Sequence, residues 1–265
     1  MSNLKDVLKN VKYLLLDMDG TVYLGGKLIG NMDKTLDKIR KAGKKIIYLT
    51  NNSSKSVESY YKKLTDMNLF RLGDEVKTSG LAAIDFLKAN RKGKTVRLFG
   101  TTSLKEEFAK NGINVTEEGV ADICVLAYDT ESTYVKLCKF TDNLWGNAEY
   151  IATHPDINCP SENKPLPDVG SFIELIKTST GRVPDVIIGK PYKTFGDWLM
   201  REYNAAPKEF MMVGDRLYTD IAFGVNCGFH SLFVLSGEGT EDMVDKSDKK
   251  PEFILDSLND IVEYL

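Results

Sequence analysis

Four short segments, far apart in the chain, carry residue types that together could transfer a phosphate group. They are Asp17-Met18-Asp19-Gly20-Thr21, Thr50-Asn51-Asn52, Gly189-Lys190-Pro191 and Gly214-Asp215-Arg216, with Asp220 close behind the last. Each follows an apolar run that predicts a β-strand, and open α/β sheets bind ligands beyond the carboxyl ends of their strands. We therefore expect two carboxylates, a hydroxyl, an ammonium and two further carboxylates along one sheet edge.

The first segment pairs two carboxylates behind a predicted buried strand at 13–16. Asp17 ends the strand and Asp19 follows two residues later, so each raises the pKa of the other unless a cation or a donor intervenes. One can then act as a nucleophile while the other acts as an acid. An Asp-x-Asp-Gly loop that binds calcium is the alternative. An EF-hand needs further oxygen ligands and a Glu at its twelfth position, and the apolar residues 22–24 disfavour it.

The second segment lies between a predicted strand at 45–49 and a predicted helix. Backbone N–H groups at the start of a helix, together with a hydroxyl, form a cradle for phosphate. The same residue types are common helix N-caps, and capping is the simpler interpretation of this segment taken alone. Beside the other segments, we favour phosphate binding by Thr50, Asn51 and Asn52.

The third and fourth segments add a cation and two acids. Lys190 follows a predicted strand at 185–188, and its ammonium group can neutralise phosphate oxygens. Asp215 suits direct ligation of magnesium, which typically takes one or two carboxylates together with phosphate oxygens and waters. Asp220 could orient a water, hold Lys190, or cap the helix that follows; these alternatives stay open.

The elements that must position these residues alternate between apolar runs and helical periods. This alternation predicts an α/β fold with a Rossmann-like, doubly wound, mainly parallel sheet. Gly25-Gly26 predicts a two-residue hairpin turn. A second alternating block, with strands near 96–99, 123–127 and 150–152, predicts an inserted α/β domain at 79–184. Residues 1–78 and 185–265 would then form the catalytic core. Trp145 and Trp198 are both expected to pack in a core.

Composition narrows the classes of function. The net charge of -3 and the pI near 5.6 argue against nucleic acid as a partner. The start of the chain predicts no signal peptide, and no segment approaches the roughly 20 apolar residues that would cross a membrane. The four cysteines, Cys124, Cys138, Cys159 and Cys227, form no CxxC pair. We expect free thiols, with Cys124 buried, and a reducing cytoplasm.

Taken as a set, these segments resemble the haloacid dehalogenase superfamily of aspartate-based phosphatases. The spacing along the whole chain is similar to that of its p-nitrophenylphosphatase, or NagD-like, branch. The matching stretches are 17–22, 49–54, 189–191, 214–220 and 234–237. In that branch a large α/β cap is inserted between the second and third motifs, as the block 79–184 would be here.

The resemblance implies catalytic roles for five residues. Asp17 would attack phosphorus and become an aspartyl-phosphate, which divides a slow hydrolysis into two easier steps. Asp19 would protonate the departing alcohol and then take a proton from the hydrolytic water. Thr50, Asn51 and Lys190 would stabilise charge on the transferring oxygens.

The resemblance also implies a cofactor and a class of substrate. Mg²⁺ would be held by Asp17, the backbone carbonyl of Asp19 and Asp215, and Asp220 would act on the ion without ligating it directly. The partner would be a small phosphorylated metabolite, such as a sugar phosphate, a nucleotide, phosphoglycolate or pyridoxal phosphate, with p-nitrophenyl phosphate as a generic substrate. Homodimerisation through the inserted block stays open.

Residues of the inserted block are expected to select the substrate. In the branch that the chain resembles, cap residues reach the leaving group, and the candidates here are His154 and Asp156. The polar loop 159–170 holds three prolines, and a stiff loop loses little entropy on binding. We expect it to form part of the specificity surface; a connector without a substrate role is the alternative. His154 is not expected to act as a catalytic base, because Asp19 already fills that role.

Two other functions remain as alternatives to a magnesium-dependent phosphomonoesterase. One is a phosphate-ligand binding or regulatory protein that keeps the pocket without turnover. The presence of both Asp17 and Asp19 weighs against it. The other is a phosphoacceptor like a response regulator, which also has Asp, Thr and Lys at strand ends. That fold is about half this length and has no inserted domain.

Overall fold

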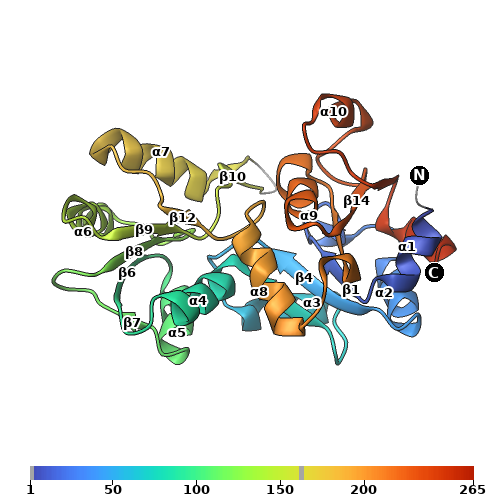
Figure 1. Cartoon of the computed structure of the whole chain (residues 1–265), viewed down its shortest axis with the longest axis horizontal. Helices are drawn as coiled ribbons and strands as arrows, with labels where there is room; N and C mark the ends of the chain where they lie inside the picture. The colour runs from blue at the N-terminus through green and yellow to red at the C-terminus, as the bar shows by residue number, and fades with distance from the viewer. Residues whose placement is uncertain (1–2, 161–163) are drawn as a thin grey trace. The chain divides into compact units, whose positions relative to one another are not determined.

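The computed structural model describes residues 3–160 and 164–265. Residues 161–163, which belong to the loop 159–170 proposed above as a specificity surface, lie outside this description. The chain divides into two compact units. Unit 1 comprises Met1–Thr50, Tyr60–Lys77 and Lys190–Leu265, and unit 2 comprises Asn51–Ser59 and Thr78–Gly189. Each unit has its own parallel sheet, coloured by position along the chain in Figure 1.

The sheet of unit 1 has the strand order β15-β14-β13-β1-β4-β5. Its strands are β1 (Tyr13–Leu16), β4 (Lys45–Thr50), β5 (Glu75–Thr78), β13 (Phe210–Gly214), β14 (His230–Val234) and β15 (Phe253–Leu255). β1 pairs in parallel with β13 on one side and with β4 on the other. Leu16 stands opposite Val213 and Tyr48 in the two registers, so the carboxyl ends of the three strands meet at one edge.

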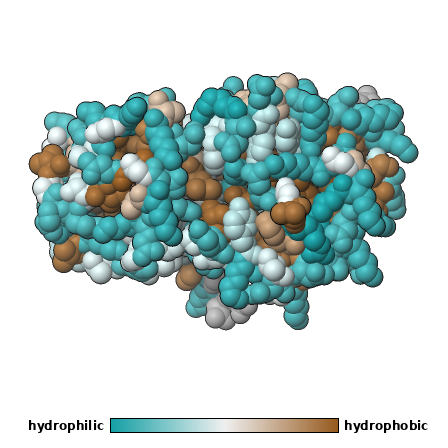
Figure 2. All heavy atoms as spheres, turned by 90° about the horizontal axis from the view of Figure 1, so that it is seen from below, coloured by the Kyte–Doolittle hydropathy of each residue, from teal (hydrophilic) through white to brown (hydrophobic). Residues whose placement is uncertain are grey.

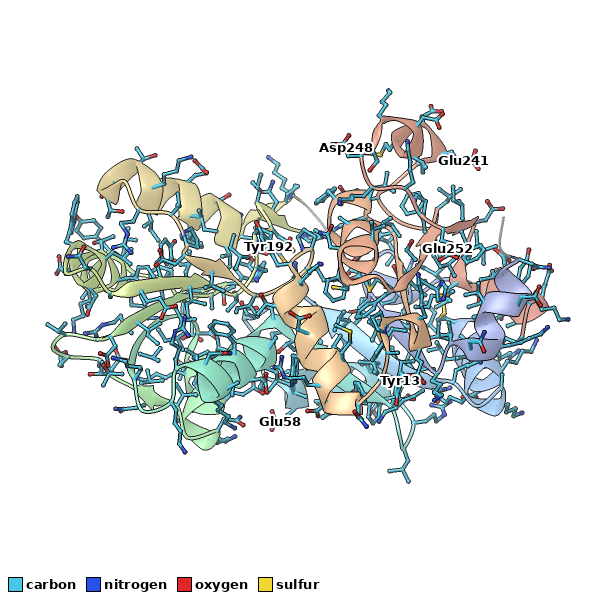
Figure 3. The ribbon with its side chains drawn as sticks, viewed as in Figure 1. Tyr13, Glu58, Tyr192, Glu241, Asp248 and Glu252 are labelled. Carbon is cyan, nitrogen blue, oxygen red and sulfur yellow. The ribbon has the colours of Figure 1, made fainter. Side chains whose placement is uncertain are left out.

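Apolar runs explain why β1 lies at the centre. Leu14, Leu15 and Leu16 are all fully buried, which confirms the prediction of a strand covered on both faces. Tyr13, labelled in Figure 3, begins the strand and stacks on Phe210 of β13 with ring centroids 4.8 Å apart.

Helices and short turns complete unit 1. The helices are α1 (Leu4–Asn10), α2 (Met32–Lys41), α3 (Val57–Asp66), α8 (Lys193–Tyr203), α9 (Ala222–Cys227) and α10 (Glu241–Lys246). Shorter helical turns are η1 (Pro207–Glu209), η2 (Leu217–Ile221) and η3 (Leu258–Glu263). The first residues of α3 belong to unit 2. An antiparallel hairpin joins β2 (Tyr23–Leu24) to β3 (Lys27–Leu28) through Gly25 and Gly26, which confirms the predicted turn.

The larger sheet of unit 2 has the order β12-β9-β8-β6-β7, and its strands are parallel. They are β6 (Thr95–Phe99), β7 (Asn114–Val115), β8 (Ile123–Leu126), β9 (Glu149–Ala152) and β12 (Val186–Ile187). The helices are α4 (Ser79–Asn90), α5 (Thr102–Lys110), α6 (Tyr134–Trp145) and α7 (Val169–Thr180), and β10 (Asn158–Cys159) pairs with β11 (Leu166–Pro167). Figure 1 shows α6 and α7 on one face of the sheet and α4 and α5 on the other.

Two predictions about packing were wrong. The strand expected at 185–188 does not join the sheet of unit 1, because Val186 and Ile187 pair with Ile151 and Ala152 of unit 2. Trp145 ends α6 with 62% of its surface exposed, since the apolar contacts of that helix are made by other faces. Trp198, at 7% exposure, does pack in a core as expected.

The fold class is confirmed: both units are mainly parallel sheets covered by helices. Cys124 is fully buried, as its apolar surroundings predicted. Hydrophilic residues cover most of the face seen in Figure 2, with hydrophobic ones scattered among them. Among the described residues, no helix combines the length and the apolar character needed to cross a bilayer.

Candidate active site

The candidate site of unit 1 begins where β1 and β13 end. Asp17 directly follows β1, and its N–H donates to the carbonyl oxygen of Val213 at 2.9 Å. That bond continues the parallel ladder by one residue, so Asp17 follows its strand beside the last residue of β13, and Asp215 comes directly after that strand. Asp17, Asp215 and Asp220 each offer a carboxylate oxygen, and these oxygens lie within 4.8 Å of one another. We call these three residues, with Lys190, the carboxylate cluster.

Lys190 supplies the positive charge of this cluster. Its Nζ donates to Asp17 Oδ1 at 2.7 Å and to Asp220 Oδ1 at 2.6 Å, and its side chain is 3% exposed. Burial lowers the pKa of Lys190, but its contacts with Asp17 and Asp220 outweigh that effect and raise it. The ammonium group therefore stays charged between two carboxylates.

Lys190 lies in the cluster as predicted, but the strand before it belongs to a different sheet from the one predicted. The strand before it, β12, belongs to the sheet of unit 2, and Lys190 is the first residue of the last segment of unit 1, just ahead of α8. The prediction that all four segments follow strands of one sheet was therefore wrong for the third segment. The lysine itself does meet Asp17.

Asp220 lies within η2, a π-helical turn, and is not the N-cap of α9, which is Ile221. Its Oδ2 accepts from the backbone N–H of Arg216 at 3.2 Å, while Oδ1 holds Lys190. A Cβ on Gly214 would come within 2.3 Å of the Asp220 side chain, so only glycine fits there. Burial raises the pKa of Asp220, and the Lys190 ammonium opposes that rise. Of the roles left open, holding Lys190 is the one that this geometry supports.

Asp215 sits in a cradle that two glycines leave open. A Cβ on Gly237 would lie 2.0 Å from Asp215 Oδ2, and one on Gly20 would lie 2.3 Å from it. The same oxygen accepts from the backbone N–H of Glu238 at 2.8 Å, and Oδ1 lies 3.5 Å from Thr21 Oγ1. Burial, and then the charge of Asp17, raise the pKa of Asp215 to about 6. A buried carboxylate under like-charge repulsion is a group that a divalent cation stabilises.

Asp19 lies two residues after Asp17, in the turn that leads into the β2–β3 hairpin. Its backbone forms an isolated bridge with Tyr23, and the N–H of Gly20 donates to the Tyr23 carbonyl oxygen at 2.7 Å. Burial raises the pKa of the Asp19 carboxyl, and the Lys63 ammonium and a backbone hydrogen bond from Gly25 oppose the rise. A carboxyl with a raised pKa keeps its proton at higher pH than usual, and can then donate it to a leaving group.

The second predicted segment is divided between the units. Thr50 ends β4 in unit 1, where it is 9% exposed, and Asn51 and Asn52 begin the first segment of unit 2. The Asn51 amide donates to both oxygens of Asp156, at 3.1 and 3.2 Å. The Asn52 side chain accepts from Ser54 N at 2.9 Å, which makes a local turn. Two predicted site residues, Asn51 and Asp156, are thus brought together within unit 2.

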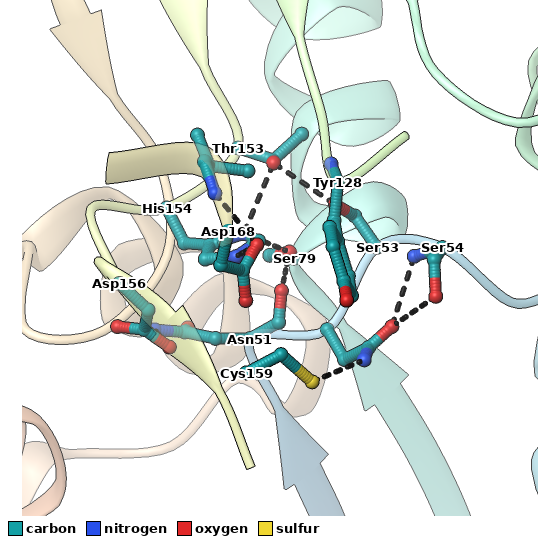
Figure 4. A network of polar contacts seen from close by, with 12 residues as sticks. Asn51, Ser53, Ser54, Ser79, Tyr128, Thr153, His154, Asp156, Cys159 and Asp168 are labelled. Carbon is teal, nitrogen blue, oxygen red and sulfur yellow. Dashed lines mark hydrogen bonds and ion pairs between the residues drawn. The ribbon is translucent and has the colours of Figure 1, made fainter. Parts of the chain in front are cut away.

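His154 belongs to a buried network of unit 2, drawn in Figure 4. Its Nε2 lies 3.0 Å from Asp168 Oδ1, and its Nδ1 lies 3.1 Å from Thr153 Oγ1 and 3.4 Å from Ser79 Oγ. The His154 side chain has no exposed surface. Asp168 is also the N-cap of α7, where it accepts from Val169 N at 2.7 Å. We call His154, Thr153, Ser79 and Asp168 the histidine network.

Several residues of these two sites were not singled out from the sequence. Asp168 was named only as part of the loop 159–170, and its position before a helical period is a signal for an N-cap. Gly237 was noted only within a matching stretch, and nothing in the sequence shows that a carboxylate needs the space it leaves. Lys63 was not identified at all, since a lysine in a helix usually lies in solvent.

Comparison with known proteins gives a consistent family. A model of "Haloacid dehalogenase-like hydrolase" matches residues 14–114, and a second model, of HAD-hydrolase-like domains, matches 187–261. The chain is 31% identical over 252 residues to an acid sugar phosphatase of Staphylococcus haemolyticus, covering 95% of each protein.

Solved structures agree. The 4-nitrophenylphosphatase of Thermotoga maritima superposes with a TM-score of 0.92 at 37% identity, over 97% of this chain and 98% of that one. The glycerol phosphate phosphatase of Mycobacterium tuberculosis, solved in complex with calcium, gives a TM-score of 0.88 at 26% identity, over 96% of this chain and 75% of that one. These matches confirm the resemblance to the p-nitrophenylphosphatase branch. The chain belongs to the haloacid dehalogenase-like hydrolase family and is a phosphatase of that family.

Proposed function

We propose that this chain hydrolyses small phosphomonoesters with the help of magnesium and through an aspartyl-phosphate on Asp17. The carboxylate cluster is the observation that carries the proposal. Lys190 Nζ donates to Asp17 Oδ1 at 2.7 Å. A carboxylate oxygen of Asp215 lies within 4.8 Å of one of Asp17. A carboxylate nucleophile beside a fixed ammonium and further carboxylates is the arrangement that phosphoryl transfer to an aspartate requires.

The chemistry runs in two steps. An Asp17 oxygen forms a bond to phosphorus as the bond from phosphorus to the leaving alcohol oxygen breaks, and Asp19 gives that oxygen its proton. A water then attacks the phosphorus of the aspartyl-phosphate while Asp19 takes its proton, which releases phosphate and restores Asp17. Lys190 and Thr50 stabilise charge on the phosphoryl oxygens throughout. Asn51 joins them in this proposal, and Asn52 supports the turn that carries it.

The donor set fits a hard divalent cation. Asp17 and Asp215 offer carboxylate oxygens close together, and the glycine cradle keeps Asp215 in place. With the backbone carbonyl of Asp19, these oxygens would hold Mg²⁺, and Asp220 would orient its surroundings. When bound, the ion supplies positive charge that offsets the repulsion between carboxylate and phosphate. The calcium in the mycobacterial relative supports a divalent site of this kind.

Unit 2 is proposed as the domain that selects the substrate, and unit 1 as the catalytic core. Asp156 is the residue of unit 2 that we propose for substrate selection, because it is only partly buried and accepts from the Asn51 amide. His154 has no exposed surface, so its effect on selectivity would be indirect, through the chain between Thr153 and Asp156. The substrate is a small phosphorylated metabolite, and the sugar phosphatase relatives favour a sugar phosphate.

The remaining expectations follow from the same proposal. The four free cysteines support a reducing cytoplasm as the location. A homodimer through unit 2 remains an expectation from the resemblance. The alternative of a phosphate-binding protein without turnover has no specific observation in its favour.

The test is release of p-nitrophenol from p-nitrophenyl phosphate by the wild type and by Asp17→Asn, each with Mg²⁺ and with a chelator. We expect turnover only in the wild type with the metal present. Asp33→Asn, which changes a residue of the first turn of α2, serves as the matched control and should keep its activity. Full activity of Asp17→Asn, or activity that survives the chelator, would refute the proposed chemistry.

A further inference from the structure

Lys63 holds a position beside the proposed acid that neither the sequence nor the family match assigns. It lies in the part of α3 that belongs to unit 1, and its Nζ sits 3.8 Å from the centroid of the Tyr23 ring. Tyr23 is 3% exposed, so the ring is a fixed platform. An ammonium over an aromatic face is attracted by the ring quadrupole, which favours this position of the flexible side chain.

Tyr23 is in turn fixed to the turn that carries Asp19. The isolated bridge joins the backbones of Asp19 and Tyr23, and Gly20 N donates to the Tyr23 carbonyl oxygen. The Lys63 charge also reaches the Asp19 carboxyl: burial raises the pKa of Asp19, and Lys63 is the largest influence that lowers it. Lys63 itself is only partly buried, so its ammonium can still meet a ligand.

The adjacent residue shows what an ordinary lysine of this helix does. Lys62 is exposed and pairs with Asp66, four residues along α3, at 2.7 Å. A lysine in the last turn of a helix also suits the helix dipole. Neither effect explains why Lys63 is placed over Tyr23, where its charge acts on the Asp19 carboxyl. The two lysines therefore form a matched pair, one exposed and paired with Asp66 and one placed over Tyr23.

We propose that Lys63, positioned by Tyr23, selects phosphomonoesters whose alcohol portion carries a second negative charge. The inference rests on the proposed function, in which Asp19 protonates the leaving oxygen. That oxygen would then lie against Asp19, and we place the alcohol portion of the substrate on the side of Asp19 where the Lys63 charge acts. A carboxylate or a second phosphate on the alcohol would be attracted by the ammonium, whereas a cationic alcohol would be repelled.

The size of the effect follows from one charge pair close to the protein surface. At separations of several ångströms and with partial screening by water, such a pair changes kcat/KM by about tenfold. Salt weakens it, because the charges are not fully buried. The preference is thus modest for one substrate but clear across a matched series.

The experiment uses three esters of similar size with different leaving-group charge. They are 2-phosphoglycolate (anionic), 2-hydroxyethyl phosphate (neutral) and phosphoethanolamine (cationic). The kcat/KM of each is measured for the wild type, Lys63→Met, Lys63→Arg and the control Lys62→Met. We expect the wild type to prefer the anionic ester over the neutral one by about tenfold, and the cationic one to be poorest.

The ratio between esters is the decisive quantity, since it cancels any general loss of activity. Lys63→Met should bring the anionic-to-neutral ratio close to one, whereas Lys63→Arg and Lys62→Met should keep it. An unchanged ratio in Lys63→Met, or an equal loss of the ratio in Lys62→Met, would overturn the inference. Absence of turnover by the wild type on these esters and on p-nitrophenyl phosphate would instead refute the proposed function, and this inference with it.

Discussion

The carboxylate cluster of unit 1 and the histidine network of unit 2 are both largely buried sets of polar groups, but they differ in how their charges are balanced. The cluster brings the carboxylates of Asp17, Asp215 and Asp220 together, the Lys190 ammonium contacts Asp17 and Asp220, and like-charge repulsion helps to raise the pKa of Asp215. In the network, His154 has a partner at each ring nitrogen, and Asp168 also caps a helix.

This difference helps to distinguish residues that bind a ligand from residues that stabilise the fold. A buried polar group with all its partners stabilises the fold, because removing one partner leaves the other unsatisfied. A set of carboxylates with too little positive charge is less stable alone and is stabilised by a cation or a phosphate held nearby. We therefore expect substitutions in the cluster to reduce turnover and substitutions in the network to reduce stability.

The largest effect is expected for Lys190→Met. It removes the ammonium that contacts Asp17 and Asp220, and loss of a fixed charge of this kind lowers kcat by about 10²–10³. Kinetics on p-nitrophenyl phosphate measure it. Lys193→Met, three residues along and exposed, is the control and should keep wild-type kcat. If Lys190→Met and Lys193→Met had the same kcat, the cluster would not be the catalytic group.

Gly237→Ala should give the next largest loss. Its new Cβ would lie 2.0 Å from Asp215 Oδ2, so the carboxylate must move and the affinity for Mg²⁺ should fall. We expect about a tenfold rise in the Mg²⁺ concentration that gives half-maximal activity, an effect of the size seen when groups around a metal site are changed. Gly26→Ala, where a Cβ meets nothing within 4 Å, is the control. Equal metal requirements in the two variants would contradict the cradle.

Asp168→Asn should act on stability instead. It weakens the charge-assisted contact with His154 and the cap of α7, so we expect a loss of about 1–3 kcal/mol in the free energy of unfolding. Because no residue of the network is proposed to contact the phosphoryl group, kcat for p-nitrophenyl phosphate should stay within a few-fold of wild type. Urea denaturation and kinetics on the same samples separate the two effects. A large loss of kcat without loss of stability would place the network in the catalytic site.

The smallest effect concerns an ion pair of unit 1 outside both clusters. Burial alone would raise the pKa of Glu75, but contacts with Lys45, Lys77 and Tyr203 lower it to about 2. A lowered acid pKa stabilises the fold above the ordinary pKa near 4.5, and this contribution is lost as the pH falls toward 2.

Glu75→Gln should therefore cost about 1 kcal/mol at pH 7 and progressively less below pH 4.5, since the pair is partly exposed. Thermal unfolding of wild type and variant across that pH range measures the difference. Glu58→Gln, a change of an exposed acid labelled in Figure 3, is the control and should show no such trend. A constant difference at all pH values would contradict the assignment.

Much of the fold could be predicted because strands that are buried on both faces leave long apolar runs in the sequence. The run before Asp17 and the run before Asp215 identified β1 and β13, and adjacent parallel strands bring their following residues together. The meeting of these two carboxylates was thus expected from the sequence. The roles assigned to them remain predictions.

Other features depend on contacts that the local sequence does not record. Val186 and Ile187 are apolar enough for either sheet, and only their pairing with β9 decides between them. Helix α4 was not predicted, because its many buried small residues give little periodicity. The position of Asp220 within a π-helical turn is likewise set by packing around Lys190 and Gly214, not by its neighbours in the chain.

The order of the strands in unit 1 has a consequence for synthesis on the ribosome. β1 emerges early, yet one of its two partners, β13, is made almost 200 residues later. All of unit 2 lies between these two strands in the sequence and can complete its own sheet first, since domains commonly fold as units while the chain grows. During that interval one edge of the apolar strand β1 lacks its partner strand β13. The nascent chain is therefore most exposed to aggregation and chaperone binding before residue 214 has left the tunnel.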